Sequence, residues 1–164
     1  MAALVPLFVA GAAAAALAAA LISQYGFDLQ PCVLCIWQRW PYLAAILLGL
    51  AAVGLRRHAA ARTALTALAI LAVLTSGGIG AFHVGVEQGW WEGTSGCGSI
   101  STTDDLAALR AQIMNAPIVR CDEVAFALFG ISMAGWNLLF ALGVALVAGR
   151  AMLRGRRALP GDRA

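Results

Sequence analysis

The chain has 164 residues, of which 62% are hydrophobic and only 12% are charged. In a typical soluble domain about a quarter of the residues are charged. This composition excludes an ordinary soluble enzyme and predicts a membrane protein. The formal net charge is +3, and the eleven basic residues are all arginine. Their clustering is typical of a membrane topology signal, so we expect no nucleic-acid partner.

Four apolar stretches are long enough to cross a bilayer, which takes about 20 residues for a hydrocarbon layer of roughly 30 Å. They cover residues 4–22, 33–55, 63–86 and 126–149. We therefore expect an all-α membrane protein, with one domain over 1–164 folded as a four-transmembrane-helix bundle. The first stretch has no basic residue after Met1 and exceeds the apolar core of about 7–15 residues of a signal peptide, so we expect it to be retained.

Charged residues are sorted between the two sides of this bundle. Eight arginines lie in the 56–62 turn or the 150–164 tail: Arg56, Arg57, Arg62, Arg150, Arg154, Arg156, Arg157 and Arg163. Seven of the eight acidic residues lie elsewhere: Asp28, Glu87, Glu92, Asp104, Asp105, Asp122 and Glu123. The positive-inside rule then places the turn and both termini in the cytoplasm, and the 23–32 and 87–125 loops outside. In a bacterium this means the inner membrane, with the loops in the periplasm, where disulfides persist.

The long 87–125 loop begins with Trp90 and Trp91, which we interpret as anchors at the membrane interface. Thr102 and Asp105 have the spacing of a capping box. The apolar residues that follow recur with helical spacing and predict a short amphipathic helix over 103–114, lying on the outer membrane surface and ended by Pro117: Leu106, Leu109 and Ile113.

Glycines in and beside the last two predicted spans suit close helix packing in lipid. They are the SGGIG segment at 76–80, Gly130, Gly135 and Gly143. We expect most of them to serve packing alone.

All four cysteines fall on the outward side, and their spacing suggests that Cys32 pairs with Cys35 and Cys97 with Cys121. Two close ligand pairs would suit structural zinc, but the second pair is 24 positions apart, and Ile36 replaces the histidine of a haem motif. We therefore expect no metal. Structural disulfides remain an alternative, since closing the 97–121 loop would stabilise the fold by about 3–4 kcal/mol.

The C-x-x-C pair is more typical of thiol–disulfide exchange. Pro31, just before Cys32, fits a helix that begins there, and the helix N-terminus would favour a thiolate at Cys32 or Cys35. Arg39 follows at i+4 from Cys35, on the same helix face. A guanidinium within a span is costly, so it either reaches the interface or stabilises a thiolate or negative charge on an electron acceptor. His83 lies at a comparable depth, where a packing role is the alternative.

The segments PCVLCIWQR (31–39) and FHVGVE (82–87), the cysteine-bracketed loop and the four spans together resemble the DsbB family of bacterial inner-membrane thiol:quinone oxidoreductases, over nearly the whole chain. The resemblance implies that a reduced periplasmic DsbA-like oxidase attacks the Cys97–Cys121 disulfide at Cys97. Cys121 would then exchange with Cys32 and leave Cys35 as a thiolate against a quinone, either ubiquinone or menaquinone. Arg39 and His83 would bind that quinone.

Three alternatives remain open at this stage. A vitamin K epoxide reductase-like enzyme has the same chemistry, but its C-x-x-C follows the loop cysteines, whereas here it precedes them. A specialised relative serving one dedicated oxidase would have the same motifs. A membrane scaffold would use the cysteines only as structural disulfides.

Overall fold

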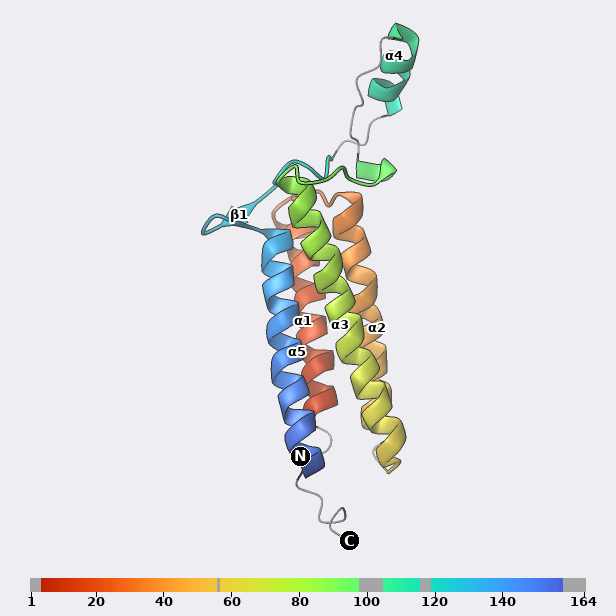
Figure 1. Ribbon diagram of the computed structural model, residues 1–164, viewed down its shortest axis with the longest axis vertical. Helices are drawn as coiled ribbons and strands as arrows, with labels where there is room; N and C mark the ends of the chain where they lie inside the picture. Colours follow the sequence, from red (N-terminus) through yellow and green to blue (C-terminus); the bar gives the residue numbers. More distant parts are fainter. Residues whose placement is uncertain (1–3, 56, 98–104, 116–118, 158–164) are drawn as a thin grey trace.

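The computed structural model describes residues 4–55, 57–97, 105–115 and 119–157. Four long helices lie side by side in a bundle (Figure 1): α1 (Leu4–Gly26), α2 (Val33–Gly54), α3 (Ala59–Glu87) and α5 (Met133–Arg157). Each contains an apolar window long enough to cross a membrane. The expected all-α, four-helix membrane architecture is therefore confirmed.

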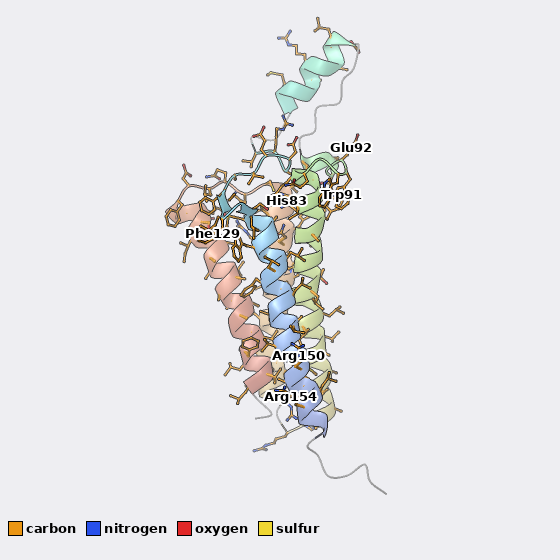
Figure 2. The ribbon with its side chains drawn as sticks, turned by 60° about the vertical axis from the view of Figure 1, so that its left-hand side comes forward. His83, Trp91, Glu92, Phe129, Arg150 and Arg154 are labelled. Carbon is orange, nitrogen blue, oxygen red and sulfur yellow. A yellow bond between two sulfur atoms is a disulfide. The ribbon has the colours of Figure 1, made fainter. Side chains whose placement is uncertain are left out.

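The two ends of the bundle differ in what they carry. The start of α1, the end of α5 and the turn between α2 and α3 lie at one end (Figure 1). Arg150 and Arg154 lie toward that end, and His83 and Glu92 toward the other (Figure 2). The arginine-rich segments and the cysteine-bearing segments are thus separated by the length of the bundle.

Small side chains fill the bundle interior and large apolar ones cover its outside. The buried core contains Val9, Ala13, Tyr42, Ala45, Ala69, Val73, Ala141, Val144 and Ala148. Exposed positions include Leu47, Leu71 and Leu146, each more than half exposed. Small residues let helix backbones approach closely, and the exposed leucines match a surface covered by lipid tails.

The prediction of close helix packing holds for Gly77 and Gly80 but not for Gly78 or Gly143. A Cβ on Gly77 would lie 2.7 Å from the Cβ of Ala141, and one on Gly80 would lie 3.0 Å from the Ala134 carbonyl oxygen. Both glycines therefore allow α3 and α5 to touch. Gly143 has nothing within 4 Å of such a Cβ, so it serves no close contact.

The fourth helix begins at Met133, whereas the sequence predicted a span from residue 126. Two short antiparallel strands precede it, β1 (Ala127–Leu128) and β2 (Ile131–Ser132). Phe129 and Gly130 between them have φ of 53° and 77°, the left-handed pair that a tight hairpin turn requires and that glycine adopts readily. The Ser132 Oγ then accepts from the Gly135 N–H and caps α5. The hairpin is as apolar as the helix that follows, so hydropathy did not mark where the helix begins.

The loop helix α4 (Leu106–Asn115) begins three residues later than predicted. The Asp105 carboxylate caps it by accepting from the Ala107 N–H at 3.0 Å. Thr102 and Pro117, which the sequence assigned to its two ends, lie outside the described residues. The helix projects beyond the end of the bundle opposite the start of α1 (Figure 1). That it lies on the membrane surface stays a prediction.

Trp91 folds back onto α3. Its ring stacks on Phe82 with centroids 5.8 Å apart, and its Nε1–H donates to the Phe82 carbonyl oxygen at 2.9 Å. Gly85 lies beneath the ring, where an added Cβ would be 1.9 Å from Trp91 Cζ2. This contact fixes the path of the chain toward Cys97, in addition to any role of the ring at the interface.

Gly85→Ala should therefore displace Trp91 and destabilise the protein by about 1–3 kcal/mol, the usual cost of overpacking. Thermal unfolding in detergent, with tryptophan fluorescence as a second readout, measures the effect. The matched control is Gly78→Ala, because a Cβ there meets nothing within 4 Å. Equal unfolding temperatures for the two variants would show that the Trp91 contact does not constrain the loop.

Candidate redox site

Cys32 is the N-cap of α2, with extended backbone dihedrals. Its sulfur lies 3.2 Å from the Cys35 sulfur and accepts from the Cys35 backbone N–H at 3.4 Å. Both residues are free thiols, with Cys32 buried and Cys35 half-buried. The helix begins where Pro31 predicted, so the free N–H groups of its first turn face the sulfur.

The pKa of the Cys32 thiol is lowered to about 4. The main cause is the hydrogen bond to the Cys35 side chain; the His83 ring and the Cys35 N–H act in the same direction, whereas burial opposes them. These contacts therefore favour the thiolate form of Cys32. The sequence left this choice between Cys32 and Cys35 open.

His83 lies beside this sulfur on α3 and is almost fully buried. Its Nε2 is 3.6 Å from the Cys32 sulfur and 3.8 Å from Glu87 Oε1, and its Nδ1 is 3.2 Å from Gln38 Nε2. The second carboxylate oxygen of Glu87 is buried and has no hydrogen-bond partner in the described part of the chain. Cys32, Gln38 and Glu87 therefore all approach the ring.

Gln38 belongs to a network of polar side chains from three helices. Asn137 Nδ2 donates to Gln38 Oε1 at 2.8 Å and to the Ser76 carbonyl oxygen at 3.1 Å. The Tyr42 hydroxyl donates to Asn137 Oδ1, and the Ser76 hydroxyl donates to the Gln38 carbonyl oxygen. Sequence reasoning missed these four residues as parts of the site. Polar side chains within spans are the signal that could have found them, because they are costly in lipid.

Arg39 reaches across to α1, where its Nη1 donates to Gln24 Oε1 at 2.6 Å. Its Nε is buried and has no partner among the described residues. The side chain lines the same cavity as Cys35. Both readings of Arg39 from sequence stay predictions, because the side chain borders the cavity of the thiols and also bonds Gln24 near the end of α1.

That cavity has a volume of about 410 Å³ and is bordered by all four long helices. It brings together four of the six predicted site residues: Cys32, Cys35, Arg39 and His83. Phe126, Trp136 and Phe140 form part of its predominantly apolar wall. Pockets of 300–1,000 Å³ or so with apolar walls and a few polar groups are typical of small-molecule sites.

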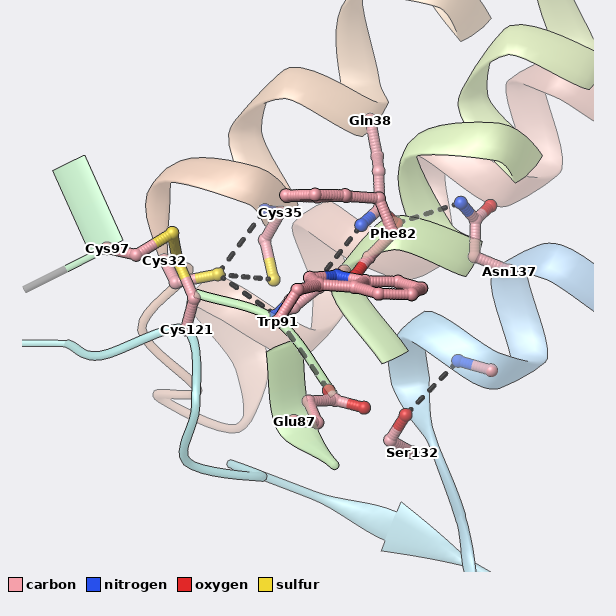
Figure 3. Close-up of polar contacts among 12 residues, drawn as sticks. Cys32, Cys35, Gln38, Phe82, Glu87, Trp91, Cys97, Cys121, Ser132 and Asn137 are labelled. Carbon is pink, nitrogen blue, oxygen red and sulfur yellow. Dashed lines mark hydrogen bonds and ion pairs between the residues drawn. A yellow bond between two sulfur atoms is a disulfide. The ribbon is translucent and has the colours of Figure 1, made fainter. Parts of the chain in front are cut away.

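The other two predicted residues, Cys97 and Cys121, form a disulfide. Both are buried and pack in one cluster with Cys32, Leu34 and Val86. The bridge thus lies next to the C-x-x-C pair (Figure 3), and neither of its cysteines lines the apolar cavity. Pairing of Cys97 with Cys121 is the one that their spacing suggested.

The two loop cysteines differ in access. Cys97 borders a second cavity of about 410 Å³, formed with Trp90, Glu92 and other loop residues. Cys121 does not border it and has no exposed surface. Gly93 permits this arrangement, because a Cβ there would lie 2.7 Å from the Cys97 Cβ. Of the two sulfur-bearing residues, Cys97 is thus the one that lines a cavity in the loop.

Comparison with known proteins agrees with this geometry. Residues 2–151 match the family described as Disulfide bond formation protein DsbB. "Disulfide bond formation protein B" of Xanthomonas oryzae pv. oryzae (strain MAFF 311018) is 31% identical over 152 residues, covering 89% of this chain and 87% of the relative. The protein of that name from Xanthomonas campestris pv. campestris (strain 8004) is 32% identical over 143 residues, covering 84% and 82%. An uncharacterised Rickettsia prowazekii protein is 30% identical over 127 residues, covering 76% and 72%. No solved structure gives a significant match.

Proposed function

We propose a path for electrons through this chain, which belongs to the DsbB family of disulfide bond formation proteins and is therefore a membrane oxidoreductase. Electrons from a reduced DsbA-like periplasmic oxidase enter at Cys97–Cys121, pass to Cys32–Cys35, and leave to a membrane quinone. The observation that carries the proposal is the position of Cys32, which packs against the loop disulfide and also borders the cavity that contains Cys35 and Arg39.

The first exchange takes place at the loop disulfide. A partner thiolate attacks the Cys97 sulfur, the Cys97–Cys121 bond breaks, and Cys121 leaves as a thiolate. The second partner thiol then attacks the mixed disulfide and departs oxidised. Access favours this direction, since Cys97 borders the outer cavity and Cys121 is fully buried.

The second exchange transfers the electron pair inward. With Cys32 and Cys35 joined, the Cys121 thiolate attacks Cys32 and Cys35 leaves. Cys97 then attacks Cys121, which re-forms the loop disulfide and releases Cys32. The helix N-terminus and His83 stabilise the Cys32 thiolate, so they favour this release.

The cavity fits a quinone. Its wall is mainly apolar and partly aromatic, and the buried Arg39 Nε–H is a donor with no partner in the described structure, so it suits a ligand carbonyl oxygen. Ubiquinone or menaquinone bound there would supply a two-electron, two-proton acceptor. Arg39 would hold the ligand oxygen, Cys35 would present its sulfur from the cavity wall, and His83 would keep a proton between the cavity and Cys32.

Orientation follows from charge. We place the arginine-rich end and both termini in the cytoplasm and the cysteine-bearing end in the periplasm of the bacterial inner membrane, because arginines near span ends favour the cytoplasmic side. This puts Cys97 in the compartment where a periplasmic oxidase would meet it. Membership of an oxidoreductase family argues against the scaffold alternative. Because the matching family is DsbB, it also argues against the vitamin K epoxide reductase-like alternative.

A reconstituted reaction tests this function. The purified protein is mixed with excess reduced periplasmic dithiol protein and a soluble quinone, and quinone absorbance is followed beside the loss of partner thiols. We expect one quinone to be reduced for each partner dithiol oxidised. Partner oxidation without loss of quinone would contradict the proposed acceptor. A panel of partner proteins in the same assay separates a general enzyme from one with a dedicated oxidase.

A further inference from the structure

The orientation of each amide in the buried network follows from one backbone group. The Ser76 carbonyl oxygen can only accept a hydrogen bond, so the Asn137 atom 3.1 Å away must be its amide nitrogen. The other side-chain atom of Asn137 is then the oxygen, which accepts from the Tyr42 hydroxyl. The same amide nitrogen donates to Gln38 at 2.8 Å, which identifies that Gln38 atom as oxygen.

The Gln38 assignment determines what faces His83. Because its oxygen points to Asn137, the Gln38 NH₂ group points to His83 Nδ1, at 3.2 Å. An N–H donor requires an acceptor opposite, so Nδ1 carries a lone pair and no proton. The neutral ring must then carry its proton on Nε2, the atom that faces Cys32 and Glu87.

We propose that Gln38 and Asn137 are positioning residues that hold His83 in the Nε2–H tautomer, so that its proton points at the Cys32 sulfur. The ring is buried, and the donor opposite Nδ1 leaves that nitrogen no place for a second proton. The groups that face the ring from the packed elements are Gln38 and Cys32 on or beside α2, Glu87 on α3, and the Cys121 backbone from the loop. The tautomer follows from this geometry alone.

The tautomer has two consequences at the thiol pair. The Nε2–H can donate to the Cys32 thiolate, which helps its release in the second exchange; this consequence rests on the proposed function. The second consequence does not. Cys32, Cys35 and His83 offer three metal-ligating atoms within 4.8 Å of one another, a grouping that suits Zn²⁺. With its proton on Nε2, the ring has no lone pair there, so the network disfavours capture of a thiophilic metal by the reduced pair.

Nitrogen NMR of the full-length protein in detergent, labelled with ¹⁵N-histidine, reads the tautomer directly. The protein has only one other histidine, and a His58→Gln variant assigns the two rings. We expect His83 to show a protonated Nε2 and an unprotonated Nδ1. A protonated Nδ1 in the otherwise unmodified protein, in either the neutral ring or the imidazolium, would overturn the proposal.

Gln38→Glu should reverse the tautomer of His83. A carboxylate accepts from Nδ1–H, so the proton should move to Nδ1 and free the Nε2 lone pair. The reduced variant should then bind Co²⁺, the probe for a zinc-type site, about tenfold or more tighter than the unmodified protein, with a thiolate-to-metal absorption band. Thr75→Ala is the control, since Thr75 is exposed and its hydroxyl donates to the Leu71 carbonyl oxygen of its own helix. An unchanged His83 tautomer in a folded Gln38→Glu protein, or equal Co²⁺ affinity, would count against the network.

Because the NMR readout needs neither partner nor quinone, the two proposals can fail separately. Loss of quinone reduction with an Nε2–H signal intact would refute the electron path and leave the positioning role standing. An Nδ1–H signal with full turnover would do the opposite.

Discussion

Cys35→Ser is expected to abolish sustained oxidation of the partner by quinone. Cys35 borders the cavity, as Cys32 does, but unlike Cys32 it is not one of the buried residues clustered with the loop disulfide. Without it the inner disulfide cannot form, so no electron pair reaches the acceptor. The loop disulfide is intact in this variant and should still oxidise partner molecules once.

Partner thiols oxidised per protein molecule distinguish the two steps. We expect a single stoichiometric burst with Cys35→Ser, followed by no turnover at any quinone concentration. Ile36→Ser is the matched control, because it places the same side chain at the adjacent, exposed position. Continued turnover by Cys35→Ser would mean that electrons leave through another group.

Cys97→Ala is expected to abolish the covalent adduct with the partner. The adduct requires a loop disulfide, and its sulfur at position 97 is the one that borders the outer cavity. Loss of the disulfide should also lower the free energy of unfolding, by about 3–4 kcal/mol for a loop of this length on the chain-entropy model. A partner that lacks its second cysteine traps the adduct, which a non-reducing gel detects.

Loss of the adduct alone does not separate the two loop cysteines, since Cys121→Ala removes the same disulfide. The adduct formed by the unmodified protein is therefore digested and its cross-linked peptide identified by mass spectrometry. We expect the peptide that contains Cys97. A cross-link to Cys121 would reverse the order of exchange, despite the complete burial of that residue.

The sequence was sufficient for features that depend on local composition. Apolar length predicted four spans, and Pro31 before Cys32 predicted where α2 begins. The sequence did not predict features that depend on contacts or boundaries beyond the local pattern. The apolar run from residue 126 continues through the hairpin into α5, so hydropathy could not locate Met133 as the helix start.

The polar network shows the same limit within the site. Arg39 and His83 were identified because a charge or an imidazole in a span is conspicuous. Gln38, Ser76 and Asn137 meet only through the packing of α2, α3 and α5, and no spacing within one helix reveals that register. The choice of Cys32 as the thiolate depends on the same packing, because His83 comes from another helix.

The central claim is that Cys35 and Arg39 face one cavity in which a quinone accepts electrons, and Arg39→Ala tests it most directly. Quinone reduction and adduct formation at Cys97 are measured separately on the same preparation, with Arg57→Ala at the opposite end of the bundle as control. We predict quinone reduction about 100-fold slower, the usual effect of removing a donor to developing negative charge, with adduct formation unchanged. An equal loss in both steps, or in neither, would contradict the account.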